Sequence, residues 1–340
     1  VYFTIILKRH KREVRYFKRI WKKGPKVLQN SMEKGWITCK IRKCFVSLNP
    51  CEVYFYMKKM YANLMLVSVT IIWGGGFIAT AEALDSVSPF YVMMIRFMGA
   101  SILPIMISFP KLKRLNRKDI KHGIIAGVFL FFAFAFQTFG LQYSTPSKNA
   151  FLTATNVVFV PYLLWLLWKR KPNRKEIIAS IVCLFGIALL TLKKEAMMLT
   201  YGDLLSLICA LFFALHIIAL ERYSAHIDAI AMTAILSTIC ALCFEAPPAS
   251  WNASAIGNIA YLIFVSTLLA YLIQTYAQKF TTANTASLIL SMEALFASIF
   301  SFLILHEVMS VQMIIGAVFI FASILYIEYQ PKKTIKKQQI

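Results

Sequence analysis

The sequence predicts an all-α integral membrane protein with ten transmembrane helices, arranged as two inverted repeats of five helices. Composition is the first observation: of the 340 residues, 59% are hydrophobic and 15% are charged, and the mean hydropathy is +0.65. A soluble domain carries roughly 25% charged residues and needs them to cover its surface. Long apolar runs separated by short loops are the second observation, and self-similarity between the two halves of the chain is the third.

Residues 1–60 form a basic leader that differs from the rest of the chain, since 16 of the 37 Lys and Arg residues lie there. Within it, residues 10–21 combine apolar side chains at helical spacing with a basic face, which suits an anionic membrane surface or a nucleic-acid arm. A third interpretation is that much of 1–56 precedes the natural start at Met57. Because the other cations mostly follow apolar runs, the net charge of +22 predicts the lipid bilayer as a partner and no nucleic acid.

The seven cysteines predict neither a disulfide framework nor a metal site. Three of them lie in the leader and four lie in apolar stretches. Cys240 and Cys243 have the CxxC spacing, but no second pair of ligands accompanies them. We therefore expect the thiols to pack within apolar helices, and we expect no metal and no cofactor.

Spans are predicted wherever an apolar run is long enough to cross a bilayer. A helix needs about 20 apolar residues to cross about 30 Å of hydrocarbon. The apolar runs are continuous rather than alternating, which argues against the strands of an outer-membrane β-barrel. From residue 61 onward the breaks in hydropathy place ten spans, near 62–82, 89–110, 122–142, 148–168, 174–192, 202–221, 228–244, 255–277, 284–305 and 310–328.

The short loops indicate how the spans are oriented. Cations concentrate in the loops 111–121 and 169–175 and in a basic tail, 331–340, with Lys193 and Lys194 as an exception. With ten spans, all the strongly cationic segments lie on one side together with both termini. The positive-inside rule assigns that side to the cytoplasm, which predicts a multi-pass protein of the cell (plasma or inner) membrane. No Lys or Arg occurs in the loops near 83–88, 245–254 and 306–309.

The two halves of the chain resemble one another at a shift of 137 residues. Gln137-Thr-Phe recurs as Gln274-Thr-Tyr, and the register then continues through spans three to five and eight to ten. The first two spans of each half are only weakly similar. The repeats are predicted to cover 61–195 and 200–330. Because each half has an odd number of spans, the second half enters the membrane in the opposite sense, as in transporters that build two gates around one midplane site.

Several motifs occur in a characteristic order over residues 60–330. They are Trp73-Gly74, Ser88-Pro89, Arg96-Phe97, Gly140-Leu-Gln-Tyr143, Tyr201-Gly202-Asp203, Ser291-Met-Glu293 and Gly316-Ala317. In these residues the chain resembles EamA-type members of the drug/metabolite transporter superfamily. The resemblance implies a membrane transporter, and more narrowly an exporter, of small organic metabolites. Three positions depart from the family pattern, namely Ala294 after the acid, Lys169-Arg170 at the end of span four, and Glu82 late in span one.

Ionisable side chains within apolar spans cost several kcal/mol unless they are solvated or paired, so each is a candidate for function. Glu293 lies near the middle of the ninth span, and its repeat equivalent is Asn156 in the fourth. Because the repeat relates them, we expect both side chains to face a central cavity. Glu293 could bind a cationic group of the substrate, exchange a proton, or lock helices together as a hydrogen-bonded carboxyl.

Two further polar features are candidates for the substrate pathway. Gln137 and Gln274 form a second symmetric pair, which lines the pathway or hydrogen-bonds between helices. His216 is either a packing histidine or a proton relay with Glu293 as its partner.

Aromatic side chains and an ion pair complete the candidate residues. Four aromatics that combine a flat apolar surface with a donor line the pathway or anchor the protein at the interface, namely Trp73, Tyr143, Tyr271 and Tyr276. Arg96 is expected to form a structural ion pair with Glu82. Residues 74–76 are consecutive glycines, which allow either close packing or local unwinding of span one, and we expect close packing.

Taken together, these patterns predict a secondary transporter that moves small organic metabolites by alternating access between two inverted repeats. The alternatives are a membrane-embedded enzyme and a non-transporting channel or sensor. Against an enzyme, His306-Glu307 lacks the second His of HExxH, and the chain has neither a GxSxG motif nor a P-loop. We therefore predict no catalytic residues. Proton coupling and a homodimer stay open.

Overall fold

The computed structural model describes residues 50–144, 146–191, 200–224, 227–240, 253–304 and 310–328. Within these residues every regular element is a helix, so the predicted all-α fold is confirmed. The chain divides into two compact units, Val1–Met57 and Lys58–Ile340, and the second unit contains nearly all of the described residues. Most of the predicted leader, the basic tail, Lys193-Lys194, Cys243 and His306-Glu307 lie outside the described residues.

The helices follow the order of the predicted spans. The first half contains α4 (Pro50–Leu84), α5 (Pro89–Leu112), α6 (Arg117–Gln142), α7 (Pro146–Ala154), α8 (Asn156–Trp168) and α9 (Arg174–Thr191). The second half contains α10 (Tyr201–Tyr223), α11 (Ala229–Cys240), α12 (Ala253–Tyr261), the π-helix η3 (Leu262–Leu269), α13 (Ala270–Ala277), α14 (Ala283–Leu290), α15 (Glu293–Ile304) and α16 (Val311–Glu328).

Each of the ten predicted spans overlaps one or more of these helices. In the described part of the chain, seven helical stretches are long and apolar enough to cross a membrane. The other three positions are those of α9, which has 18 residues with three charged ones in its first turn, of α11, which has 12 residues, and of α16, which has 18 residues. A multi-pass membrane protein is therefore supported, and the count of ten crossings stays a prediction.

The helix ends show why the chain turns where it does. Pro89 occupies the first turn of α5, where its missing N–H costs no hydrogen bond. The side chain of Asn116 accepts the backbone N–H of Asp119 and begins α6. Thr200 and Asp203 form a reciprocal capping box that begins α10. These caps set the boundaries of the long helices that carry the site.

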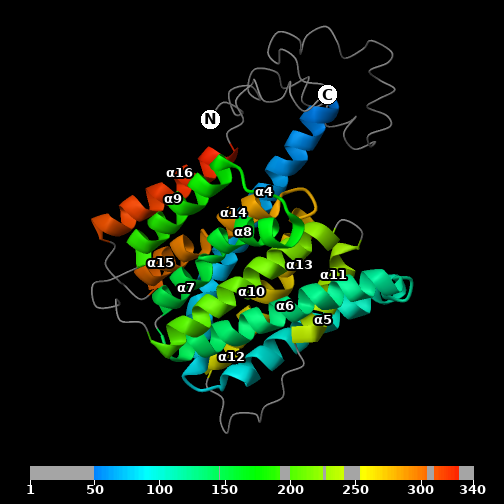
Figure 1. Ribbon diagram of the computed structural model, residues 1–340. Coiled ribbons are helices and arrows are strands. Elements are labelled where there is room, and N and C mark those ends of the chain that lie inside the picture. Colours follow the sequence, from blue (N-terminus) through cyan, green and yellow to red (C-terminus); the bar gives the residue numbers. More distant parts are fainter. Residues whose placement is uncertain are drawn as a thin grey trace, which may run out of the picture. The chain divides into compact units, whose positions relative to one another are not determined.

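Helices of the two halves pack against one another rather than forming separate bundles. The extensive helix contacts are those of α6 with α10, of α9 with α16 and of α5 with α11 (Figure 1). Each of these pairs joins one helix of the first half to one helix of the second. The space between the halves is therefore enclosed by both of them.

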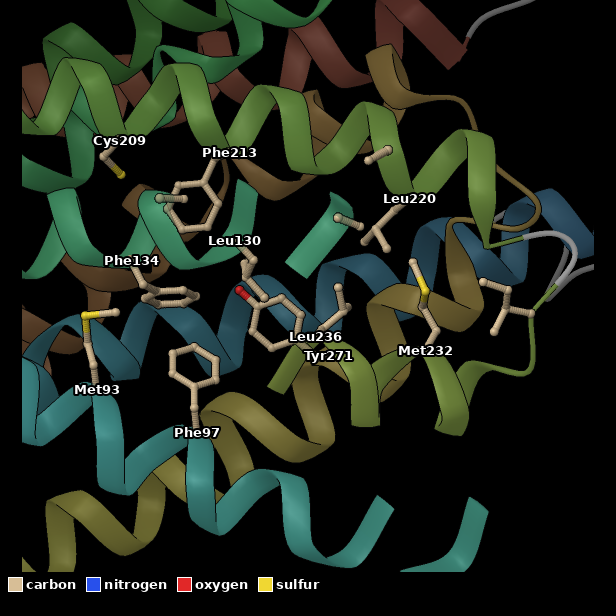
Figure 2. Packing of buried hydrophobic residues seen from close by; sticks show 14 of the residues in the cluster. Met93, Phe97, Leu130, Phe134, Cys209, Phe213, Leu220, Met232, Leu236 and Tyr271 are labelled. Atoms are coloured by element: carbon tan, nitrogen blue, oxygen red, sulfur yellow. The ribbon is translucent and has the colours of Figure 1, made fainter. Parts of the chain in front are cut away.

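An aromatic cluster fills part of that space (Figure 2). Phe134 of α6 lies edge-on to Phe97 of α5 and to Phe213 of α10, with ring centroids 5.0 and 5.4 Å apart. Tyr271 of α13 meets the same ring from another side at 6.2 Å. Such pairs contribute about 0.5–1.5 kcal/mol each beyond the area they bury. The cluster thus ties the two halves together.

Candidate functional site: a chamber between the repeats

Two cavities lie between the repeats and share lining residues. The larger has an empty volume of about 450 Å³ and the smaller of about 270 Å³. Trp73, Phe213 and Glu293 line both, so we treat the two cavities together as one chamber. Of the predicted pathway residues, the larger cavity also contains Gln137 and Tyr271, and the smaller one Asn156 and Gln274.

Two interruptions of the helices place polar side chains in this chamber. The fourth span breaks at Thr155, and Asn156 is the first residue of α8. The ninth span breaks at Ser291 and Met292, and Glu293 is the first residue of α15. At the 137-residue shift, Asn156 and Glu293 are equivalent positions. The repeat therefore relates two discontinuous helices as well as two side chains.

The breaks tighten the helices locally. The N–H groups of Thr155 and Met292 donate to the carbonyl groups three residues earlier rather than four. The hydroxyls of Thr155 and Ser291 donate to the carbonyls of Leu152 and Leu288, at 2.6 and 2.8 Å. Hydroxyl groups that bond back to their own helix in this way often bend it.

Glu293 is a buried acid that the surrounding protein does not neutralise. Its side chain is 7% exposed, and within the described residues no hydrogen bond or ion pair reaches its carboxyl group. Glu293 is the first residue of α15, where the N–H groups of Ala294 and Phe296 donate to the carbonyls of Ser291 and Met292 in the preceding turn. The carboxyl group is therefore left without a direct partner.

The amide side chains of the chamber are also incompletely bonded. The side-chain oxygens of Asn156 and Gln274 are buried and lack hydrogen-bond partners. By contrast, Nε2 of Gln137 donates to the hydroxyl of Thr153 at 3.4 Å. An orphan buried acceptor costs about 1–3 kcal/mol, so the protein alone leaves this end of the chamber unsatisfied.

Arg96 lines the larger cavity and is held by the π-helix. Its Nε donates to the hydroxyl of Thr267, and its Nη2 donates to the hydroxyl of Ser266 at 3.1 Å. The guanidinium lies 4.5 Å from the centre of the Phe134 ring. Trp73 Nε1 donates to the carbonyl of Ser266 at 3.0 Å. π-Helical segments are rare and occur frequently at functional sites.

Glu82 lies in a different environment from Arg96. It is exposed and accepts hydrogen bonds from Asn258 at 2.8 Å and from Ser254 at 3.5 Å. Arg96 is buried, and its hydroxyl partners belong to η3. Arg96 thus hydrogen-bonds to Ser266 and Thr267, whereas Glu82 hydrogen-bonds to Asn258 and Ser254.

Three other candidate residues lie outside the described chamber lining. His216 is buried, its Nδ1 is 2.9 Å from the carbonyl oxygen of Ala126, and its ring packs edge-on against Tyr271. These contacts favour the packing interpretation of His216. Tyr143 and Tyr276 are 56% and 47% exposed, which favours interfacial positions for them.

Ion pairs between the repeats lie at the end of the bundle that carries the cationic loops. Arg170 contacts Glu176 at 3.6 Å and Glu221 at 3.3 Å, and Glu221 also accepts the backbone N–H of Ala283 at 3.0 Å. These contacts join the loop between α8 and α9 to α10 and α14. The contact of Arg170 with Glu221 links the two halves at that end.

A second contact between the halves lies at the same end. Lys111 pairs with Asp228 at 2.9 Å. Partial burial alone would raise the pKa of Asp228, but the hydrogen bond and charge of Lys111 and two backbone N–H groups outweigh it and hold this pKa below its ordinary value. Burial lowers the pKa of Lys279, whose ammonium donates to the carbonyl of Ile227 at 2.5 Å.

Comparisons with known proteins agree with this architecture. A family model described as the EamA-like transporter family matches residues 60–192 and 200–329. A protein of Archaeoglobus fulgidus named an uncharacterized transporter is 30% identical over 278 residues, which cover 80% of this chain and 87% of that protein. The uncharacterized transporter YoaV of Bacillus subtilis is 25% identical over 278 residues, which cover 77% of this chain and 94% of that protein. A solved crystal structure with 15% identity superposes with a TM-score of 0.66 over 83% of this chain and 99% of its own, which shows a shared fold.

Proposed function

Since the chain belongs to the EamA-like transporter family, we propose that it is a secondary transporter that moves small organic solutes through the chamber by alternating access. In this mechanism the two repeats rock against one another, and the chamber opens to one side of the membrane at a time. Export is the direction that we propose, on the resemblance to EamA-type members of the drug/metabolite transporter superfamily.

One observation carries this proposal. Asn156 and Glu293 are equivalent in the repeat, each begins the second part of a discontinuous helix, and both line the chamber. In secondary transporters, solute and coupling-ion sites are typically formed by discontinuous helices at the interface between repeats. The chamber, the helix breaks and the repeat therefore all support a solute site beside Asn156 and Glu293.

The orientation is part of the proposal. We place both termini and the loops around Lys113 and Lys171 in the cytoplasm and the loop around Asp85 outside, within the cell membrane. Single cysteines at these three positions, labelled with a membrane-impermeant maleimide in intact cells, test it. We expect labelling at position 85 alone, with positions 113 and 171 labelled after permeabilisation. Labelling of all three from outside would contradict the orientation.

Replacement of Glu293 tests the transport mechanism. In proteoliposomes loaded with a labelled metabolite extract, we expect Glu293→Gln and Glu293→Ala to reduce exchange roughly tenfold or more, because a charge-assisted contact is worth about 1.5–3 kcal/mol. Glu82→Gln is the matched control, since that acid is exposed at the end of α4. Full exchange by both Glu293 variants would remove this residue from the mechanism, and chemical conversion of a solute would instead favour an enzyme.

A further inference from the structure

We propose that the smaller cavity of the chamber binds a protonated amine of the transported solute, with Glu293 as its counter-ion. This inference rests on the proposed function, because it assigns a chemical class to the solute of that same site. The smaller cavity is lined by Trp73, Asn156, Phe213, Ile217, Leu290 and the two residues Gln274 and Glu293. Glu293 is the charged residue of this lining.

The missing partner of Glu293 is the first argument. A carboxylate only accepts hydrogen bonds, and a buried charge is retained in a protein when it is paired or hydrogen-bonded. The described residues provide neither for Glu293. Arg96, in contrast, has two hydroxyl partners and an aromatic ring against its guanidinium. Glu293 is thus the acid of the chamber whose carboxylate form a bound cation would stabilise.

The orphan oxygens are the second argument. Asn156 and Gln274 line the same cavity, and each carries a buried side-chain oxygen without a hydrogen-bond partner. A primary ammonium group has three N–H donors and no acceptor. The carboxylate and the two amide oxygens supply acceptors for such a group, whereas a carboxylate or phosphate of a solute would meet like charge at Glu293.

The walls of the cavity are the third argument. Trp73 and Phe213 line both cavities, and Trp73 packs against Tyr271 with ring centroids 5.4 Å apart. Aromatic faces attract ammonium groups and also contact apolar surface. An aromatic wall beside an acid therefore suits an amine with an apolar body.

Matched ligands test the proposal on the purified full-length protein. The probes are primary amines with alkyl and aryl bodies, among them 2-phenylethylamine, and the alcohol and carboxylate of the same body, here 2-phenylethanol and 3-phenylpropanoate. Binding is followed by quenching of tryptophan fluorescence. We expect at least one amine to bind tenfold or more tightly than its alcohol, and Glu293→Gln to remove that difference. The control Glu82→Gln should retain it.

A second variant makes the test independent of damage at Glu293. Asn156→Asp adds an acid at the repeat-equivalent position, and we expect it to increase the preference for amine over alcohol at least threefold. Failure of every amine to bind, a preference for the carboxylates, or an amine preference that persists in Glu293→Gln would overturn the proposal. If the protein exchanges solutes in proteoliposomes but shows no preference for amines, the amine site is rejected and the transport function is not. Amine binding without any exchange would reject transport instead.

Discussion

Gly74 shows at the scale of a single residue how closely the two halves approach. A Cβ atom at this position would lie 2.6 Å from Cβ of Phe296 and 2.8 Å from the backbone nitrogen of Ala297. Those atoms belong to α15, the helix that Glu293 begins. The close packing predicted for the three glycines of span one is therefore confirmed at Gly74, and it brings α4 against the helix that carries the acid.

Substitution of Gly74 tests this contact. Since the obstructing atoms include backbone, the new methyl group cannot be accommodated by a side-chain rotation, and we expect Gly74→Ala to destabilise the protein by about 1–3 kcal/mol. The thermal unfolding midpoint in detergent measures the effect. Gly257→Ala is the matched control, because nothing lies within 4 Å of its added Cβ and alanine favours helix there. Equal midpoints for Gly74→Ala and the unchanged protein would contradict the close approach.

Single residues also mark the limit of prediction from the sequence. The 137-residue repeat identified Asn156 and Glu293 as partners, and the structure places both in one chamber. Tyr143 and Tyr276 are exposed instead, because a flat aromatic side chain with a donor is equally suited to the membrane interface. The sequence pattern did not predict that Ser266 and Thr267 bind Arg96, although hydroxyl side chains within an apolar run are a detectable signal.

At the scale of elements, the helix breaks and the π-helix were not predictable from hydropathy. Residues 262–269 contain no Gly or Pro. The hydropathy of an apolar run is the same whether the run forms an α-helix or a π-helix. The break before Glu293 lies likewise within a continuous apolar stretch. Spans and their order follow from length and hydrophobicity, whereas their interruptions depend on side-chain to backbone bonds that composition does not reveal.

The start of α11 depends on a charge that pH can remove. Asp228 pairs with Lys111 and also accepts the backbone N–H groups of Ile230 and Ala231. Because its folded-state pKa is lowered, the pair stabilises the protein above the ordinary pKa of aspartate, and this stabilisation is lost as the pH falls through the lowered pKa. Asn at this position keeps the cap oxygen and removes the charge.

We therefore expect Asp228→Asn to lower the unfolding midpoint at pH 7 by the equivalent of up to about 1 kcal/mol, since the pair is largely exposed. The difference between the variant and the unchanged protein should shrink as the pH falls below the ordinary pKa of aspartate, and it should vanish below the lowered pKa, where the aspartate is protonated in the folded state too. Midpoints recorded across this pH range, at low salt, provide the measurement. A difference that is independent of pH would assign the effect to the cap rather than to the charge.

At the scale of the whole molecule, alternating access requires contacts that break when the chamber opens. The pairs of Arg170 with Glu221 and of Lys111 with Asp228 join the first half to the second at the end with the cationic loops. In the structure they hold that end together. Their loss should favour the state in which the chamber opens towards the cationic loops.

A cysteine in the smaller cavity reports this opening. We expect Arg170→Gln to increase, at least twofold, the rate at which an impermeant maleimide modifies Ile217→Cys in inside-out vesicles. Lys171→Gln is the matched control, because Lys171 is an exposed neighbour in the same loop. Equal rates in the two backgrounds would show that the ion pairs do not restrain the chamber.

The π-helix makes the two halves chemically unequal. At the 137-residue shift, Ser266 and Thr267 of η3 correspond to Phe129 and Leu130 of α6, which pack in the aromatic cluster. If the halves were exchanged about their pseudo-two-fold axis, the apolar side chains of Phe129 and Leu130 would therefore take the place of the hydroxyls that bind Arg96. In the transporter proposed above, such unequal halves would make the two facing conformers unequal in free energy. The empty protein would then favour one facing conformer, and the solute would bind with a different apparent affinity from each side of the membrane.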